Sequence, residues 1–122
     1  MTTYAIKVDT DNKIEIVEFD PTKSYETIKE AVGGGLFDCV PISSLGVDMW
    51  IDDEGKLVDE PVWNAFATSL WVKEYGMTDA IAGDVIITGG TDEDGNTLGI
   101  SKDKAIELLM VVRETIDFII KA

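Results

Sequence analysis

The sequence predicts an α+β fold, a single small domain with a mostly antiparallel sheet of hairpins, two short helices and a longer C-terminal helix. Three observations support it: short β-type runs alternate with turn-forming residues, two apolar stripes at helical spacing interrupt them, and a longer stripe ends the 122-residue chain. Strands joined by short turns favour antiparallel pairing with the helices on one face. No repeat, linker or low-complexity tract divides residues 1–122, so we expect one domain.

The first third of the chain predicts a hairpin followed by a helix. Residues 4–8 and 14–19 are β-type runs, and the polar residues 9–13 between them favour a turn. Apolar residues three and four positions apart predict a helix over 25–32. The three glycines at 33–35 end it.

The middle of the chain predicts a short strand and a second hairpin. Residues 37–42 form the strand candidate, which we expect Pro41 to end. Residues 47–51 and 56–58 flank the polar turn 52–55, whose final glycine suits a positive φ. We therefore expect these two runs to pair with each other.

The last part of the chain predicts two helices separated by a weaker hairpin. An apolar stripe over 62–75 follows a proline and indicates a helix. Residues 83–88 form a compact apolar strand, and the turn 92–96 directs the chain back along 97–100. A final helix is expected over 101–121.

The final helix has more apolar residues than one buried stripe requires. One face carries Ile106, Leu109, Met110, Arg113, Ile116 and Ile120, and further apolar residues lie off that face. Such a helix is either enclosed in the core or pairs with another chain, and both alternatives stay open. Arg113 is the only arginine, suited to an ion pair inside the domain or across a homodimer. The candidate dimer residues are Val112, Arg113, Ile116 and Ile119.

Negative charge dominates the chain and is concentrated in its middle. The sequence has 24 Asp and Glu against 10 Lys and Arg, for a net charge of −14. Residues 48–94 alone contribute −10. Such a field attracts cationic partners and repels nucleic acid and anionic membranes. The candidate charge patch, mostly at predicted turns, consists of Asp48, Asp52, Asp53, Glu54, Asp59, Glu60, Asp92, Glu93 and Asp94.

The composition predicts no catalytic residue, metal site or cofactor. Histidine is absent, and the single cysteine, Cys39, has apolar neighbours that favour a buried, unreactive thiol. The acidic turn at 92–96 lacks the spacing of a calcium-binding loop, so a hairpin turn is expected there. No segment resembles a signal peptide or a membrane span, which predicts a cytoplasmic protein without membrane contact.

A small-molecule pocket is an alternative, formed by Trp50, Trp63 and Asn64. Tryptophans left exposed provide stacking surfaces, and an amide between apolar residues can orient a ligand. The structural interpretation of Asn64 is a side-chain bond that orders the start of its helix or the preceding hairpin. We favour that interpretation.

An ordered set of motifs spans about 75 residues of the chain. They are Tyr25-Glu26-Thr27-Ile28, Val32-Gly33-Gly34, Asp48 to Leu57, Pro61 to Thr68 and Ile81 to Ile87. This set resembles the DUF3846 family, small domains common in phages and other mobile elements and without an established activity. The resemblance implies a mobile-element setting. Here Gly35-Leu36-Phe37-Asp38 replaces the aromatic or aliphatic residue and glutamate that commonly follow the glycine pair.

Two functions follow as hypotheses. The leading one is a phage-type interaction protein that binds and inhibits a host protein through its basic surface, its carboxylates taking the place of nucleic-acid phosphates. The alternative is a homo-oligomeric protein that binds or sequesters a nucleotide-like small molecule. An enzyme is not expected.

Overall fold

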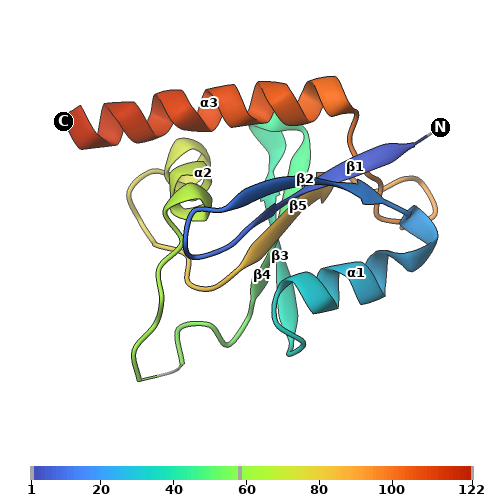
Figure 1. Cartoon of the computed structure of the whole chain (residues 1–122), viewed down its shortest axis with the longest axis horizontal. Coiled ribbons are helices and arrows are strands. Elements are labelled where there is room, and N and C mark those ends of the chain that lie inside the picture. The colour runs from blue at the N-terminus through green and yellow to red at the C-terminus, as the bar shows by residue number, and fades with distance from the viewer. Residues whose placement is uncertain (1, 58, 122) are drawn as a thin grey trace.

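The computed structural model describes residues 2–57 and 59–121, and side chains as far as residue 113. A five-stranded sheet lies between helices (Figure 1). The strands are β1 (Thr3–Val8), β2 (Ile14–Phe19), β3 (Phe37–Ile42), β4 (Val47–Asp52) and β5 (Val85–Gly89). The helices are α1 (Ser24–Ala31), α2 (Ala65–Tyr75) and α3 (Lys102–Lys121), with short 3-10 helices η1 (Pro21–Lys23) and η2 (Ser43–Leu45). The predicted α+β fold is confirmed.

The order of the strands in the sheet is β2-β1-β5-β4-β3, and neighbouring strands run antiparallel. β5, which comes last in sequence, lies between two hairpins formed earlier in the chain. Its side chains are all buried, with Val85 and Ile87 on one face and Ile86 on the other. The central position of this short apolar strand joins the two hairpins into one sheet.

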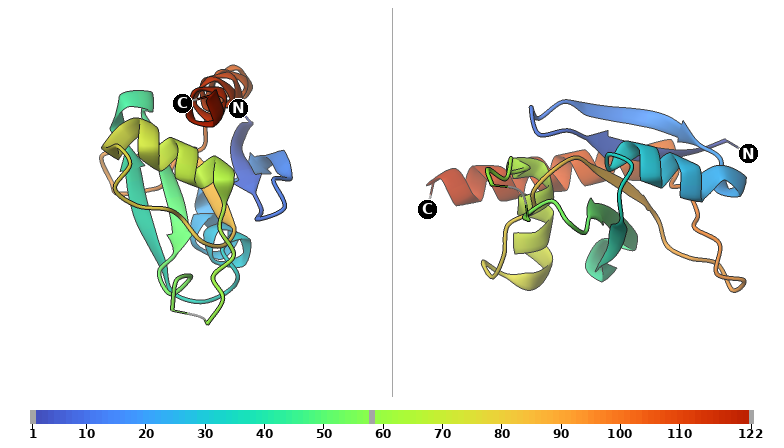
Figure 2. Two further views of the ribbon diagram at one scale, coloured as in Figure 1. Left: turned by 90° about the vertical axis from the view of Figure 1, so that its left-hand side faces the viewer. Right: turned by 90° about the horizontal axis from the view of Figure 1, so that it is seen from below.

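Helices cover both faces of the sheet, whereas the sequence predicted helices on one face. α1 packs Ile28 and Ala31 against Ile86 on one side. α2 and α3 cover the other side, where Phe66 and Leu108 join the larger apolar cluster (Figure 2). Strands β1 and β5 are apolar on both sides, so a single helical layer would leave one side exposed to water.

The predicted hairpin between residues 47–51 and 56–58 is wrong. β4 pairs instead with β3, through η2 and a left-handed Gly46 at φ 69°. Residues 56 and 57 belong to no strand, and Val58 lies outside the described residues. Gly55 does not have the positive φ that we expected. A Cβ there would lie 3.0 Å from the Ala82 carbonyl oxygen, so close packing of the backbone explains this glycine.

Two further expectations about strand ends were only partly right. β3 continues through Pro41 to Ile42, because β3 is an edge strand and needs no N–H on its free side. The turn at 92–96 forms, with Gly95 at φ 84°. Residues 97–100 form only isolated bridges, one of them between Ile100 and Tyr4.

The buried face of α3 differs from the one predicted. Ala105, Leu108 and Val112 are buried, whereas Ile106 and Met110 are exposed. The apolar residues of α3 are distributed around its whole circumference. Their spacing alone therefore could not identify the face that packs on α2 and β1. The Ser101 hydroxyl oxygen accepts a hydrogen bond from the Lys104 backbone N–H at 3.1 Å and caps the helix.

Candidate functional site

Asn64 holds together three segments at one end of the sheet. Its side chain is 0% exposed. Its Oδ1 accepts from the Ala67 N–H at 3.0 Å, which caps α2. Its Nδ2 donates to the carbonyls of Gly83 at 2.9 Å and Val8 at 3.3 Å. The structural interpretation of Asn64 is confirmed, and its amide has no polar atom left for a ligand.

The segment just before Asn64 is fixed as a short ladder against residues 81–83. The Asn64 N–H donates to the Ile81 carbonyl at 2.8 Å, and the Gly83 N–H donates to the Val62 carbonyl at 2.8 Å. Trp63 lies between these bonds, opposite Ala82. Its side chain is nevertheless 52% exposed. A large indole therefore faces water from a well-ordered backbone, and a tryptophan in this position is available to contact a partner.

The acidic segment after β4 forms a tight turn beside this ladder. Asp52 Oδ1 accepts from the Glu54 N–H at 2.9 Å, and the Asp53 N–H donates to the Leu36 carbonyl at 3.1 Å. The Lys56 ammonium contacts the Asp79 carboxylate, and this bond lowers the pKa of Asp79. The turn thus exposes its carboxylates while its backbone is held in place.

An open hollow of about 270 Å³ lies between the turn and the ladder. Leu57 on its rim is 79% exposed. The residues that line it are Ile51, Asp52, Asp53, Lys56, Leu57, Ile81 and Ala82. We call this hollow, its neighbour Trp63 and the carboxylates of Asp52, Asp53, Glu54 and Asp84 the acidic end. Asp59 and Glu60, which belong to the predicted patch, are exposed and follow the turn in the sequence.

Asp84 was missing from the predicted patch, although it directly precedes β5. Its carboxylate accepts from the Thr10 N–H at 3.1 Å and so joins the β1–β2 turn to this end. A Cβ on the adjacent Gly83 would lie 3.9 Å from the Asp52 Cβ. Only the order of the strands brings Asp84 beside Asp52, so turn composition gave no signal for it.

The predicted charge patch is divided between two ends of the sheet. Trp50 pairs with Ile86 and Val47 with Gly89, so β4 ends where β5 begins. Asp52 therefore lies at one end, and the turn 92–94 follows the other end of β5 (Figure 1). The five residues of β5 separate the two groups of carboxylates by about 15 Å. This distance exceeds the Debye length of about 8 Å at physiological salt, so the two groups do not act as one patch.

Asp48 belongs to neither end. It lies half-buried on the face of the sheet that α1 partly covers, next to Cys39. Burial raises the pKa of Asp48. Burial and the Asp48 charge together raise the pKa of the half-buried Cys39 thiol to about 11, so it is protonated at neutral pH. Asp48 thus contributes little to a surface that a partner contacts.

A family model, described as a domain of unknown function (DUF3846), matches residues 1–112. The chain belongs to the DUF3846 family. The match includes every element of the sheet and the described side chains of α3 up to Val112. No curated protein and no solved structure matches the chain.

The three pocket candidates of this DUF3846 chain do not face a common space. Asn64 is enclosed, and Trp63 is exposed at the acidic end. Trp50 lies on the α1 side of the sheet, where its indole N–H donates to Thr88 Oγ1 at 2.9 Å. The ring of Phe37 packs edge-on against Trp50 at 5.7 Å. A nucleotide pocket built from these three residues has no support in this geometry.

The candidate dimer residues are also separated in the structure. Val112 is 2% exposed and packs inside the domain rather than on its surface. Arg113 is exposed. The side chains of Ile116 and Ile119 lie outside the described residues.

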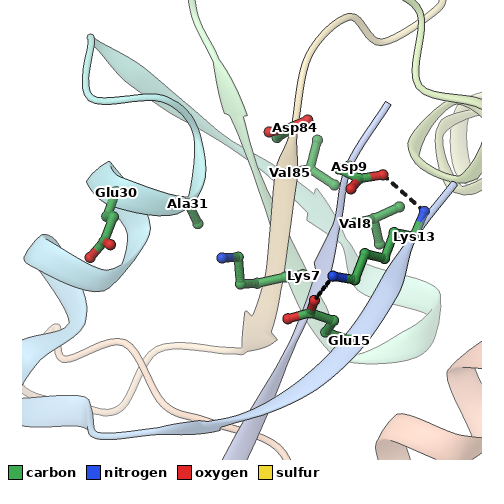
Figure 3. A pocket seen from close by; sticks show the side chains of 9 residues that line it. All are labelled: Lys7, Val8, Asp9, Lys13, Glu15, Glu30, Ala31, Asp84 and Val85. Atoms are coloured by element: carbon green, nitrogen blue, oxygen red, sulfur yellow. Dashed lines mark hydrogen bonds and ion pairs between the residues drawn. The ribbon is translucent and has the colours of Figure 1, made fainter. Parts of the chain in front are cut away.

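A second hollow of about 190 Å³ opens between α1 and the starts of β2 and β5 (Figure 3). Four of the six charged residues that line it, all except Lys7 and Glu30, are engaged in hydrogen bonds or an ion pair. The Lys13 ammonium lies 2.8 Å from the Glu15 carboxylate, and Asp9 Oδ1 accepts from the Lys13 N–H at 2.9 Å. Asp84 is engaged with the Thr10 N–H. This hollow therefore offers fewer free charges than the acidic end.

The described residues include neither a metal-binding cluster nor a membrane-spanning helix. No group of three or more His, Cys, Asp or Glu there is placed to hold a metal ion. Within the same residues, no helix has the length and apolar character to cross a membrane.

Proposed function

We propose that this DUF3846 domain is an interaction protein whose acidic end binds a basic surface of a host protein and keeps nucleic acid from that surface. The observation that carries the proposal is the hollow of about 270 Å³, with apolar residues in its floor and carboxylates on its rim. The mobile-element setting implied by the family resemblance supports a host target.

The hollow suits one long basic side chain of the partner. Ile51, Ile81 and Ala82 provide apolar surface for its methylene groups, while Asp52 and Asp53 accept hydrogen bonds from its charged head. Lys56 does not neutralise this rim, because its ammonium is engaged with Asp79. A lysine or arginine can therefore bury its stem without losing ionic partners.

Trp63 and Leu57 provide the apolar part of the proposed interface. Both are exposed at the acidic end, and exposed tryptophans are frequent hot spots in protein complexes. A second cation of the partner can also stack on the indole face of Trp63. Apolar contacts hold the complex, and the surrounding carboxylates select a basic partner and accelerate its encounter.

A matched pair of charge variants tests this proposal. Asp53→Asn with Glu54→Gln removes two negative charges at the acidic end. Glu93→Gln with Asp94→Asn removes two at the opposite end and serves as the control. None of these four carboxylates has a hydrogen-bond or ion-pair partner among the described residues, so both double variants keep the fold.

The assay is capture of host proteins from a lysate on each immobilised variant, followed by titration of a purified captured partner. We expect the acidic-end variant to bind about 10-fold more weakly, which corresponds to about 1.4 kcal/mol, and the control to bind like the wild type. Equal losses in both variants would mean that net charge alone drives binding. Unchanged binding in both would reject the acidic end as the site.

A further inference from the structure

The two edges of the sheet differ in how they are protected against added strands. β3 forms one edge, and three features block its free side. Pro41 has no N–H. The Cys39 N–H donates to Asp38 Oδ1 at 2.8 Å, and the Pro41 carbonyl accepts from the Tyr75 hydroxyl. These features leave β3 poorly suited to pair with another chain.

β2 forms the opposite edge, and the register shows which of its backbone groups are free. Tyr4 exchanges two hydrogen bonds of 2.8 Å with Ile100, so the even residues of β1 point away from β2. The odd residues of β1 therefore pair with Glu15, Val17 and Phe19. It follows that the N–H and C=O groups of residues 14, 16 and 18 point outward.

Those outward groups lack a partner among the described residues. β2 lies along the outer margin of the molecule, with no other element beside it (Figure 2). All six of its residues pair in continuous register with β1, without a bulge or a proline. An edge strand this regular is normally shielded, as β3 is, unless it accepts another strand.

The side chains along β2 indicate what such a strand would contain. Ile14 and Ile16 lie on the side of the sheet that carries α2 and α3, followed by the exposed Glu18. Glu15 and Val17 lie on the other side. An open hollow of about 430 Å³ at the end of the strand, lined in part by Glu18, leaves room for a neighbouring side chain.

We propose that the free edge of β2 accepts an extended basic segment of a partner protein as a sixth, antiparallel strand. The charge argues for this occupant over a second copy, which would bring its own −14 against the same edge. In an antiparallel pair, side chains directly opposite each other interact most strongly, and opposite charges attract there. We therefore expect the added strand to have a basic residue opposite Glu18. This surface is separate from the acidic end and does not rest on the function proposed above.

The register specifies a probe peptide. Read from the position opposite Glu18 to the position opposite Ile14, an antiparallel partner has the sequence Lys-Thr-Val-Lys-Val. The probe is this peptide capped at both ends, and the control is Glu-Thr-Val-Glu-Val. We expect the basic peptide, at millimolar concentration, to slow hydrogen exchange of the Ile16 and Glu18 amides at least fivefold, measured by NMR. The acidic peptide should leave both amides unchanged.

Proline variants separate strand addition from simple charge attraction. Ile16→Pro removes one outward N–H and no bond to β1, and we expect it to weaken peptide binding at least 10-fold. Ile16→Thr keeps the N–H and should bind like the wild type. Glu18→Pro removes a different outward N–H and provides a second variant if the first does not fold. Asp53→Asn with Glu54→Gln should leave peptide binding unchanged, which keeps this test distinct from that of the acidic end.

Three results would overturn the proposal. The first is unchanged exchange of the Ile16 and Glu18 amides with the basic peptide. The second is equal peptide binding by folded Ile16→Pro and Ile16→Thr. The third is a concentration-dependent dimer that protects the same amides without peptide, which would assign the edge to a second copy.

Discussion

Replacing Asn64 with alanine should destabilise the domain by about 2.5 kcal/mol. The cap bond to the Ala67 N–H contributes about 1 kcal/mol, as N-cap side chains typically do. The bond to the Gly83 carbonyl at 2.9 Å contributes about 1 kcal/mol, and the longer bond to Val8 at 3.3 Å about half as much. Because Asn64 is completely buried, bulk water does not compete for these bonds in the native state.

Serine at position 64 separates these contributions. Its hydroxyl can still cap α2, but it cannot reach the two carbonyls, so Asn64→Ser should cost about 1.5 kcal/mol. The assay is urea unfolding followed by tryptophan fluorescence, with linear extrapolation to water. Equal losses for alanine and serine would show that the cap bond is unimportant. A loss under about 1 kcal/mol for alanine would refute the assignment of Asn64 as the link between the three segments.

Three further predictions follow from other parts of the structure. Gly99→Ala should cost about 2 kcal/mol in the same unfolding assay, because its Cβ would lie 2.3 Å from Thr3 Oγ1, whereas Gly35→Ala, in open space, should change stability by under about 0.5 kcal/mol. Cys39 should react with a disulfide reagent at pH 8 about 10-fold more slowly than a thiol of pKa 9.0, because its thiolate fraction is about 100-fold lower while its thiolate is about 10-fold more nucleophilic, and a comparable rate would contradict its burial. Burial raises the pKa of Asp48, so its charged form destabilises the native state. Lowering the pH from 7 to 4 should therefore stabilise the wild type relative to the Asp48→Asn variant. If the difference in unfolding free energy between the two proteins stays constant over this range, the prediction is refuted.

Local sequence signals were sufficient for most elements and failed where packing decides. Alternating apolar residues located β1 and β2, and the glycines after residue 32 marked the end of α1. The acidic turn at 52–55 has the composition of a hairpin turn, yet β4 pairs with β3. Composition indicates that a chain turns, but not which strand lies beside it next.

The candidate site was predictable only in part for the same reason. The carboxylates after β4 and the exposed Trp63 could be named from sequence, whereas Asp84 became part of the site through the position of β5. A bond from the Asn64 side chain that orders the start of this helix was predicted from its place near the beginning of an apolar stripe, and the structure makes Asn64 the N-cap. Its bonds to Val8 and Gly83 were not predictable, because they join segments distant in the sequence.

The division of the charge changes what kind of mimicry is plausible. A nucleic-acid backbone presents phosphates along a continuous line, so a mimic of a long duplex would need carboxylates along the whole length of the sheet. β5 instead separates the acidic end from the turn 92–94 by a largely apolar, buried stretch. Under the proposed function, we therefore expect the acidic end to occupy a local basic site that binds a few phosphates, and not an extended nucleic-acid groove.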